Sequence, residues 1–396
     1  MFKSLLLLLA ITLPVAAQNK NPVILLSIDG FAGDYLTQYK PPFLLKAANQ
    51  GSYTKALLPV FPSKTFPNHL SMVTGKYPNQ HGIVHNSFYH RDIKKNYTLG
   101  AGKHNSQWLT AKPIWTLAEQ KGLISGVYFW PESETRVDGV LPTYVKPYKH
   151  DTENKKRLDQ LISWLQLPKG ERPQLLISYI SMLDEIGHKY GTHSEKTKHT
   201  ILKIDALIET FVSDIKRKTK LTPNIILVSD HGMINIDQGK KLLQSDLIGE
   251  GHPEIKVVNG QTQLFVYSDN ATALNQMVTT LKNNKNHHHY QIYLAKDFPK
   301  HWYFDQHSAA TPDLVVEAIP PAIFLKPSKK YPLATHGYDP KNRKALNAML
   351  IAFGPDIKKG QEIAHLDNRY VFNLIATLLN LENDYDNDAF LQLLIN

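Results

Sequence analysis

The sequence predicts an α/β fold: a mostly parallel central sheet with helices on both faces. Three apolar runs, residues 23–29, 175–184 and 224–230, are continuous rather than alternating, as in strands buried on both faces. Helical patterns separate these runs, and strands that alternate with helices indicate βαβ units. Each run also ends on an aspartate. Because ligands bind beyond the carboxyl ends of such strands, we expect the three carboxylates to meet in one crevice.

The remaining elements follow in chain order. After the first strand, at 23–28, we expect helices at about 42–49 and 114–121, a strand at 125–130, a helix at about 152–165, a strand at 175–181, a helix at about 194–219 and a strand at 225–228. Between about 239 and 332 the pattern changes to short strands and hairpins, which predicts an inserted α+β subdomain. The chain then returns to the core with a strand at 345–354 and a closing helix at about 369–381.

The first residues predict export. MFKSLLLLLAITLPVAAQNK has a basic start at Lys3, an apolar run at 5–13, and small residues that suit cleavage after Ala17. The apolar run is shorter than the roughly 20 residues that span a bilayer. We therefore expect a signal peptide at 1–17 and a single catalytic domain at 18–396, either periplasmic or secreted, with no transmembrane anchor. The residues leave the oligomeric state open.

Composition narrows the chemistry. The 396 residues contain no cysteine, so no disulfide forms and no thiolate acts as nucleophile or metal ligand. The net charge of +10 favours anionic partners. The lysines are spread along the chain and no basic run is interleaved with aromatic residues, so we expect no specific nucleic-acid recognition. The histidine tract at 287–289 lies in a polar stretch and predicts a solvated loop.

The strand-ending aspartates have histidine neighbours. Asp184 and His188 stand four residues apart, which puts both side chains on one face of a helix; Gly187 makes a tight loop an equal alternative. Asp230 is followed directly by His231. A single aspartate after a strand is more often a turn or cap residue, but three, two with a nearby histidine, favour a metal site. Carboxylate and imidazole without sulfur suit Zn²⁺, while Mn²⁺ or Fe would accept similar ligands.

Thr65 precedes Phe66, Pro67 and a helical stretch, which predicts that it begins a helix. Its hydroxyl has two interpretations. It caps the helix, or it attacks an anionic substrate at the positive end of the helix dipole. A divalent ion would make the second role feasible, because it lowers the pKa of a bound hydroxyl as it does that of water.

Seven segments in order resemble one family. They are IDGF from Ile28, FPSKTFPNHLSMVTGKYPNQHGIVHNSFY from Phe61, FWPESE from Phe129, WLQLPKGERP from Trp164, DEIGHKYG from Asp184, VSDHGM from Val228 and THGYDP from Thr335. Together they resemble the nucleotide pyrophosphatase/phosphodiesterases of the alkaline phosphatase superfamily, in particular the short, exported bacterial members. The resemblance extends over residues 21–380.

The resemblance implies two Zn²⁺ ions per chain and a set of roles. One ion would be held by Asp184, His188 and His336, and would bind substrate and activate water. The other would be held by Asp29, Asp230 and His231, and would contact the Thr65 hydroxyl. Asn86 would hydrogen-bond a phosphoryl oxygen, and an apolar slot for the nucleobase or other leaving group would consist of Phe66, Leu99 and Tyr144.

The expected activity is zinc-dependent hydrolysis of phosphodiester or pyrophosphate bonds in nucleotide-type substrates through a covalent phosphothreonine, with release of a nucleoside monophosphate. Three alternatives stay open: a phosphomonoesterase or phosphonate hydrolase on the same site, a choline-type head-group phosphodiesterase, and a non-catalytic module that captures phosphorylated ligands. Sulfatase activity is disfavoured because those enzymes need a formylglycine made from cysteine or serine, and Thr65 cannot provide one.

Overall fold

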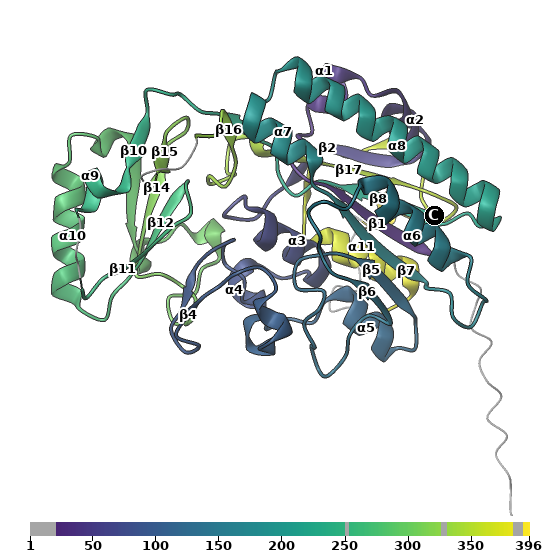
Figure 1. Cartoon of the computed structure of the whole chain (residues 1–396), viewed down its shortest axis with the longest axis horizontal. Coiled ribbons are helices and arrows are strands. Elements are labelled where there is room, and N and C mark those ends of the chain that lie inside the picture. Colours follow the sequence, from purple (N-terminus) through teal and green to yellow (C-terminus); the bar gives the residue numbers. More distant parts are fainter. Residues whose placement is uncertain (1–20, 250–252, 326–330, 383–390) are drawn as a thin grey trace, which may run out of the picture.

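The computed structural model describes residues 21–249, 253–325, 331–382 and 391–396 (Figure 1). The predicted signal peptide lies outside the described residues. Within these ranges, none of the helices combines the length and the apolar character that crossing a bilayer requires.

A nine-stranded sheet forms the body, in the order β18-β2-β17-β8-β1-β7-β5-β6 with β19 also beside β2. β1 lies between β7 and β8 and is parallel to both, while β17 runs antiparallel to its neighbours β8 and β2. The predicted fold class is therefore confirmed. The strands are β1 (Val23–Ile28), β2 (Ser52–Leu58), β5 (Ser125–Tyr128), β6 (Tyr144–Lys146), β7 (Leu175–Ile180), β8 (Asn224–Val228), β17 (Ala348–Phe353), β18 (Gln361–Glu362) and β19 (Leu366–Asp367).

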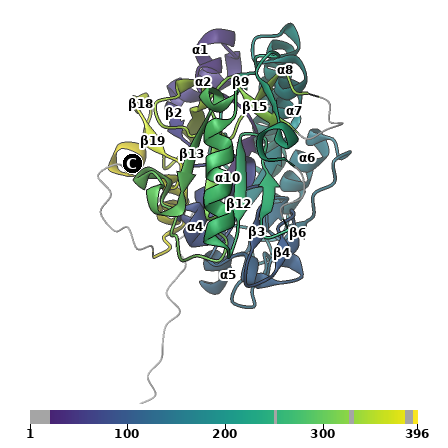
Figure 2. The ribbon, with the colours of Figure 1, turned by 90° about the vertical axis from the view of Figure 1, so that its left-hand side faces the viewer.

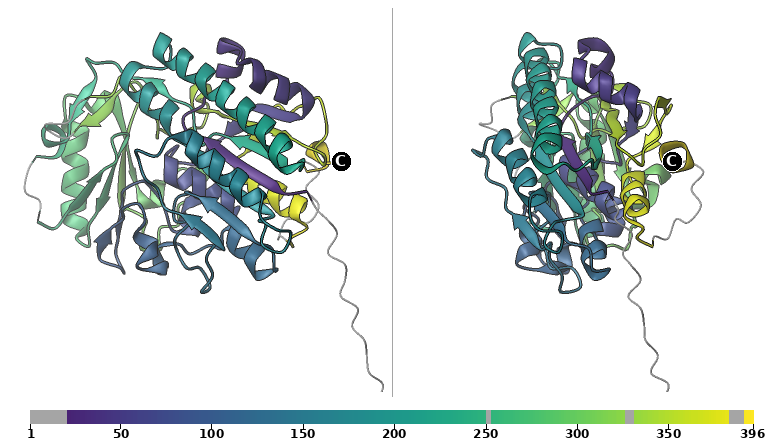
Figure 3. Two further views of the ribbon diagram at one scale, coloured as in Figure 1. Left: turned by 45° about the vertical axis from the view of Figure 1, so that its right-hand side comes forward. Right: turned by 90° about the vertical axis from the view of Figure 1, so that its right-hand side faces the viewer.

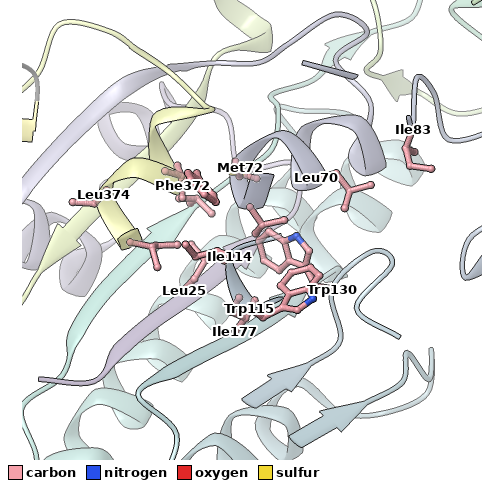
Figure 4. Close-up of a cluster of buried hydrophobic side chains, with 14 of the residues drawn as sticks. Leu25, Leu70, Met72, Ile83, Ile114, Trp115, Trp130, Ile177, Phe372 and Leu374 are labelled. Carbon is pink, nitrogen blue, oxygen red and sulfur yellow. The ribbon is translucent and has the colours of Figure 1, made fainter. Parts of the chain in front are cut away.

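Helices cover both faces of this sheet because its central strands are apolar on both sides. Val23 and Leu25 of β1 belong to one buried cluster, which α3 (Thr65–Thr74), α5 (Ile114–Gln120) and α11 (Tyr370–Leu379) complete. Figure 4 shows part of it. Ile24 and Leu26 point the other way, into a second cluster with α2 (Pro42–Gln50), α6 (Asn154–Leu165) and α8 (Glu195–Thr219). The long helix α8 lies across this face in the left view of Figure 3.

Four strands of the main sheet, β2, β6, β18 and β19, were not predicted from the sequence, and one helix was left undecided. β2 has mixed burial, buried and half-buried residues alternating, so its sequence SYTKALL lacks the continuous apolar run of the central strands. Residues 182–190, for which helix and loop were both open, form α7 (Met182–Tyr190) directly after β7. Asp184 therefore lies in the first turn of a helix, not at the end of a strand.

A second, antiparallel sheet packs beside the body. It consists of β11 (Lys256–Asn259), β12 (Gln263–Tyr267), β14 (Leu314–Ala318) and β13 (Tyr290–Leu294), with α10 (Ala271–Asn283) beside it (Figure 2). Leu264, Val316 and Leu281 contribute to a hydrophobic cluster separate from those of the body. We propose that residues 239–332 are the inserted subdomain, and we use this name for them below.

Short elements complete the described chain. They are α1 (Tyr35–Tyr39), α4 (Pro78–His81), β3 (Tyr89–His90), β4 (Lys95–Asn96), β9 (Ile234–Asn235), β10 (Lys241–Leu243), α9 (Gln244–Ile248), β15 (Ile323–Leu325), β16 (Ala334–Thr335) and α12 (Leu391–Leu394). The tract His287–His289 forms a single 3-10 turn that has no buried residue.

Candidate active site

The parallel pairing of β1 with β7 and β8 brings the three aspartates to one edge of the sheet. Asp29 follows β1 directly, Asp230 comes two residues after β8, and Asp184 lies in α7 just after β7. Gly30 allows the close approach of these segments. Its φ is 72°, and a Cβ at this position would lie 3.1 Å from the Asp184 Cα. A side chain at position 30 would strain the backbone and push Asp184 away from Asp29.

Asp29, Asp230 and His231 form one cluster, which we call the buried cluster. The His231 Nε2 lies 3.0 Å from an oxygen of Asp230 and 3.5 Å from one of Asp29. At most 2% of any of these side chains is exposed. Ordered groups surround the carboxylates: the Tyr179 hydroxyl donates to Asp29, and the Gly30 amide donates to Asp230.

Asp184, His188 and His336 form a second group, which we call the open cluster. The Asp184 Oδ1 lies 3.4 Å from the His188 Nε2 and 3.6 Å from the His336 Nε2. The exposed fractions of the Asp184 and His188 side chains are 17% and 27%. The two clusters adjoin, because the rings of His231 and His336 stack with centroids 3.5 Å apart.

The three histidines are all oriented as metal ligands would be. Each Nδ1 is within hydrogen-bond distance of a backbone carbonyl, which for His188 is that of Ala334 at 2.7 Å and for His336 that of Ser63 at 2.9 Å. His231 uses the carbonyl of Gly232 at 3.0 Å. If Nδ1 carries the proton, the lone pair of Nε2 faces the carboxylates in every case.

Three buried carboxylate oxygens also lack hydrogen-bond donors: Asp29 Oδ1, Asp184 Oδ1 and Asp230 Oδ2. Buried polar atoms without partners are costly. These oxygens and the three Nε2 atoms converge, so the residues present fit two divalent cations, one in each cluster.

The charges of the buried cluster are strongly coupled. Burial, reinforced by the charges of Asp230 and Asp184, raises the pKa of the Asp29 carboxyl well above its ordinary value. Burial acts in the same direction on Asp230, but His231 and His69 outweigh it and hold the pKa of that carboxyl well below its usual range. Burial lowers the pKa of His336 well below its ordinary value, and the nearby His231 and Lys64 add to the effect. His336 is therefore neutral, as a ligand must be.

Thr65 lies beside the buried cluster. It is the first residue of α3, it is 8% exposed, and its Oγ1 lies 3.5 Å from the His231 Nε2. The N-cap of α3 is Lys64, and no side-chain hydrogen bond caps this helix. The capping interpretation of Thr65 is therefore wrong. Its hydroxyl instead lies near a candidate ligand atom, the His231 Nε2, at the positive end of a ten-residue helix.

Asn86 and Phe66 adjoin Thr65. The Asn86 side-chain oxygen accepts a hydrogen bond of 2.9 Å from the Phe66 amide, which leaves the Asn86 Nδ2 as a donor for another group. The Phe66 ring contacts the Tyr97 ring, with centroids 6.3 Å apart. Leu99, two residues farther along the chain, is 38% exposed. Phe66 and Leu99 thus belong to neighbouring segments, and Leu99 offers an accessible apolar surface.

The structure does not bring Tyr144 to the two clusters. This tyrosine begins the edge strand β6 and pairs with Gly126 of β5, which puts it level with the start of β1, five residues before Asp29. Its ring stacks on Trp164, and its hydroxyl donates to the Glu171 carbonyl. The strand carries the chain on from this end of the sheet toward the edge where the clusters lie. The tyrosine that reaches that edge comes four residues later.

That residue is Tyr148. Its ring contacts Phe129 at 4.4 Å and Tyr179 at 6.4 Å between centroids, and Tyr179 is the residue that donates to Asp29. The Arg157 guanidinium lies over the Tyr148 ring at 5.2 Å and donates to the Tyr179 carbonyl. The sequence alone could not show which of the two tyrosines, Tyr144 or Tyr148, lies near the clusters, because this depends on where β6 ends.

A family model described as type I phosphodiesterase / nucleotide pyrophosphatase matches residues 23–339. The chain belongs to this family. Among curated relatives, ectonucleotide pyrophosphatase/phosphodiesterase family member 3 of Bos taurus is 32% identical over 91% of this chain and 42% of its own length. Venom phosphodiesterase of Naja atra is 32% identical over 92% of this chain and 45% of its own. The chain thus spans less than half the length of these two relatives.

Solved structures of the family share the fold. Human ectonucleotide pyrophosphatase/phosphodiesterase 5 superposes with a TM-score of 0.86 at 25% identity, over 94% of this chain and 99% of that one. A structure of the murine counterpart, an inactive threonine-to-alanine variant in complex with AMP, has a TM-score of 0.86 at 23% identity, over 95% and 100% of the two chains.

Sequence reasoning missed two further side chains at the site of this family member. His69, one helical turn after Thr65, has its Nδ1 2.8 Å from the Thr65 carbonyl and 3.4 Å from an Asp230 oxygen. Lys64 is buried and donates to the His336 carbonyl, and burial lowers its pKa to about 7. The helical spacing from Thr65 was the signal available for His69. No sequence signal placed Lys64 in the interior, where lysine is rare.

Proposed function

We propose that this protein is a zinc-dependent phosphodiesterase that cleaves phosphodiester or pyrophosphate bonds of nucleotide-type substrates and releases a nucleoside monophosphate. The observation that carries the proposal is the position of Thr65. A buried threonine hydroxyl lies at a helix N-terminus, 3.5 Å from His231 of a cluster that fits a divalent cation, with a second such cluster adjoining. Family membership supports the same class of reaction.

Asp29, Asp230 and His231 would hold one Zn²⁺, and Asp184, His188 and His336 the other. When bound, the ions supply Lewis acidity, which lowers the pKa of a nearby hydroxyl and offsets phosphoryl charge. The histidine Nδ1 contacts with backbone carbonyls fix the ligand rings, and the Tyr179 hydroxyl holds Asp29.

In the first step the Thr65 Oγ1 attacks phosphorus in line with the leaving oxygen. An oxygen–phosphorus bond forms, the bond to the leaving group breaks, the threonine proton is released to solvent, and a phosphothreonine ester remains. The N-terminus of α3 stabilises negative charge at this position. Asn86 donates from its Nδ2 to a non-bridging oxygen, because its oxygen is already engaged by the Phe66 amide.

In the second step water hydrolyses the ester, forms its own bond to phosphorus and returns a proton to Thr65. The open cluster is the side from which water can arrive, since Asp184 and His188 are partly exposed whereas the buried cluster is not. Two in-line steps retain the configuration at phosphorus. We assign the leaving-group slot to Phe66, Leu99 and Tyr148 in place of Tyr144.

The substrate class is nucleotide because the slot residues are aromatic and apolar, which suits a base. A murine relative in complex with AMP supports this choice. We also propose that the mature protein is periplasmic or secreted, in keeping with the predicted signal peptide.

The test compares wild type, Thr65→Ala and Thr65→Ser with zinc supplied, using the 4-nitrophenyl ester of TMP, bis-4-nitrophenyl phosphate and 4-nitrophenyl phosphate. We expect the TMP ester to react fastest, Thr65→Ala to be inactive, and Thr65→Ser to retain part of the activity because it keeps a hydroxyl. Asn79→Ala, at a half-buried position that belongs to neither cluster, is the control variant.

Three outcomes would contradict the proposal. Unaltered turnover in Thr65→Ala would exclude the nucleophile, and a preference for the monoester would favour a phosphomonoesterase. Net inversion on a chiral thiophosphate ester would rule out the covalent intermediate, even if the substrate preference were as expected.

A further inference from the structure

A cavity of about 480 Å³ lies where the inserted subdomain meets the body. The body contributes residues 58–61, Tyr77, residues 340–344, Asn347 and Asp367 to its walls, and the subdomain contributes His301 and Tyr303. Thr65, Asn86 and the residues of both metal clusters do not line it. Small-molecule sites typically enclose about 300–1,000 Å³, so the volume suits a ligand of mononucleotide size.

The charge of this cavity is positive. Lys341, Arg343 and Lys344 line it, and the ammonium groups of the two lysines form no ion pair within the part of the chain that the structure describes. Arg343 donates one hydrogen bond to the Asp339 carbonyl, which leaves most of its guanidinium donors available. The one carboxylate in the lining, Asp367, is bound by Arg369 through two hydrogen bonds of 3.0 Å. The carboxylate of Asp339, which does not line the cavity, is held by His301 and Trp302. The three positive charges of Lys341, Arg343 and Lys344 exceed the single negative charge in the lining by two, which matches a phosphate monoester that carries about −1.5 to −2 at neutral pH.

The cavity also offers a flat aromatic surface. The rings of Tyr77 and Tyr303 stack with centroids 3.7 Å apart and an interplanar angle of 12°. The Arg369 guanidinium lies 3.7 Å from the centre of the Tyr77 ring. Tyr303 lines the cavity and is 53% exposed, so part of its side chain is accessible to a further ring. Bases stack on such tyrosines with little regard to sequence.

We propose that this cavity is a second ligand site that binds a nucleoside monophosphate, the phosphate on Lys341, Arg343 and Lys344 and the base on Tyr303. Inorganic phosphate would contact only the basic residues, and a nucleoside would contact only the tyrosine ring. The inference does not depend on the proposed function, because no residue of the metal clusters takes part.

The test is titration calorimetry of the zinc-loaded protein with AMP, which has no diester bond to cleave. We expect two AMP molecules per chain in wild type: one at the catalytic site and one in the cavity. The variant Lys341→Glu/Lys344→Glu reverses two charges on exposed side chains and should weaken the cavity site by about tenfold or more. The control, Lys46→Glu/Lys203→Glu, makes the same charge change at exposed positions of α2 and α8 and should leave both sites intact.

A second variant separates the ring from the charge. Tyr303→Ala should weaken AMP binding in the cavity by about tenfold, a typical loss for one stacked base, while leaving the binding of inorganic phosphate unchanged. Adenosine should bind the cavity more weakly than AMP in wild type. Turnover of the TMP ester should be the same in all four proteins, because the altered residues do not line the catalytic site.

The inference is overturned if AMP binding in Lys341→Glu/Lys344→Glu equals that of wild type and of the control. It is also overturned if inorganic phosphate binds the cavity as tightly as AMP, because the site would then be a simple anion site. Failure of the proposed function looks different. Wild type would then bind one AMP, and the Lys341→Glu/Lys344→Glu variant would lose it.

Discussion

The two candidate metal clusters adjoin but are built differently. The buried cluster takes its residues from the ends of two neighbouring strands, and its side chains are at most 2% exposed. The open cluster takes Asp184 and His188 from a helix and His336 from a loop, and His188 is 27% exposed. The first is therefore fixed by the sheet, and the second by contacts that reach the inserted subdomain.

The difference fits a division of labour. The nucleophile that we propose, Thr65, needs a rigid environment with little water, which the strand ends supply. Water and substrate need an entry path, which a partly exposed site supplies. The loop of His336 is held from the subdomain, where Gln263 donates to the Gly337 carbonyl at 2.6 Å and Glu317 accepts from the Asp339 amide at 2.6 Å. The inserted subdomain thus helps to position one ligand of the open cluster.

The largest loss of activity is expected when Asp230 of the buried cluster is changed. Asp230→Asn keeps the shape of the side chain but removes a charge from the buried cluster, where no water can replace it. We expect kcat/KM on the TMP ester to fall by about 1,000-fold or more, which corresponds to roughly 4 kcal/mol. Mass spectrometry of the desalted protein should find one zinc fewer per chain. Full zinc content with unaltered kcat/KM would show that Asp230 is not a ligand.

A smaller effect is expected at the open cluster. His188→Ala removes a partly exposed ligand whose place water can take, so we expect kcat/KM to fall by about 100-fold, roughly 3 kcal/mol. Raising the zinc concentration should restore part of the activity, whereas it should not rescue Asp230→Asn. Equal losses without recovery in both variants would remove the distinction between the clusters.

The sequence reveals the buried cluster better than the open one for a physical reason. Strands buried on both faces have continuous apolar sequences. The apolar pattern alone therefore placed Asp29 and Asp230 at one edge of the sheet. His336 lies in a loop with no periodicity, and only the resemblance to a family pointed to it. Asp184 was expected at a strand end and lies in a helix, because the apolar run of 175–184 continues from β7 into α7 without a turn signal.

The residues of the proposed leaving-group slot were also difficult to predict from the sequence. Its aromatic residues come from separate loops, and the choice between Tyr144 and Tyr148 depends on how far β6 extends along its neighbour. Lys64 was equally hidden, since burial of a lysine depends on a tertiary contact, here with the His336 carbonyl. Local pattern fixes strands and helices, whereas these positions are decided by contacts between segments far apart in the chain.

Loss of a hydrogen bond to a residue of the buried cluster should have a moderate effect on metal affinity. Tyr179→Phe removes the hydroxyl that donates to Asp29 and keeps the ring in place. Loss of such a partner typically weakens metal affinity by about 10–100-fold, and we expect this loss at one of the two zinc ions only. Competition with a chelator measures it. Tyr290→Phe, whose hydroxyl donates to the Leu281 carbonyl in the subdomain, is the matched control and should bind both ions normally.

Glu317 supports the loop of His336. Changing it should have the smallest effect on catalysis but a clear effect on stability. Burial, with a contribution from Asp339, raises the pKa of Glu317 from 4.5 to about 8. The folded state therefore keeps a proton that the unfolded state releases above about pH 4.5. The stability contribution of this group is fully present below pH 4.5 and is lost as the pH rises through about 8, a change on the order of 5 kcal/mol.

Glu317→Gln mimics the protonated carboxyl and can still accept from the Asp339 amide. Urea unfolding at several pH values should therefore show that wild type loses stability between about pH 5 and 8 relative to the variant, while both bind zinc equally. Gln276→Glu, which introduces a carboxyl at an exposed position of α10, should follow wild type. If instead Glu317→Gln is less stable than wild type at every pH, the carboxyl is ionised in the folded protein. The support of His336 by the subdomain would then be electrostatic in origin.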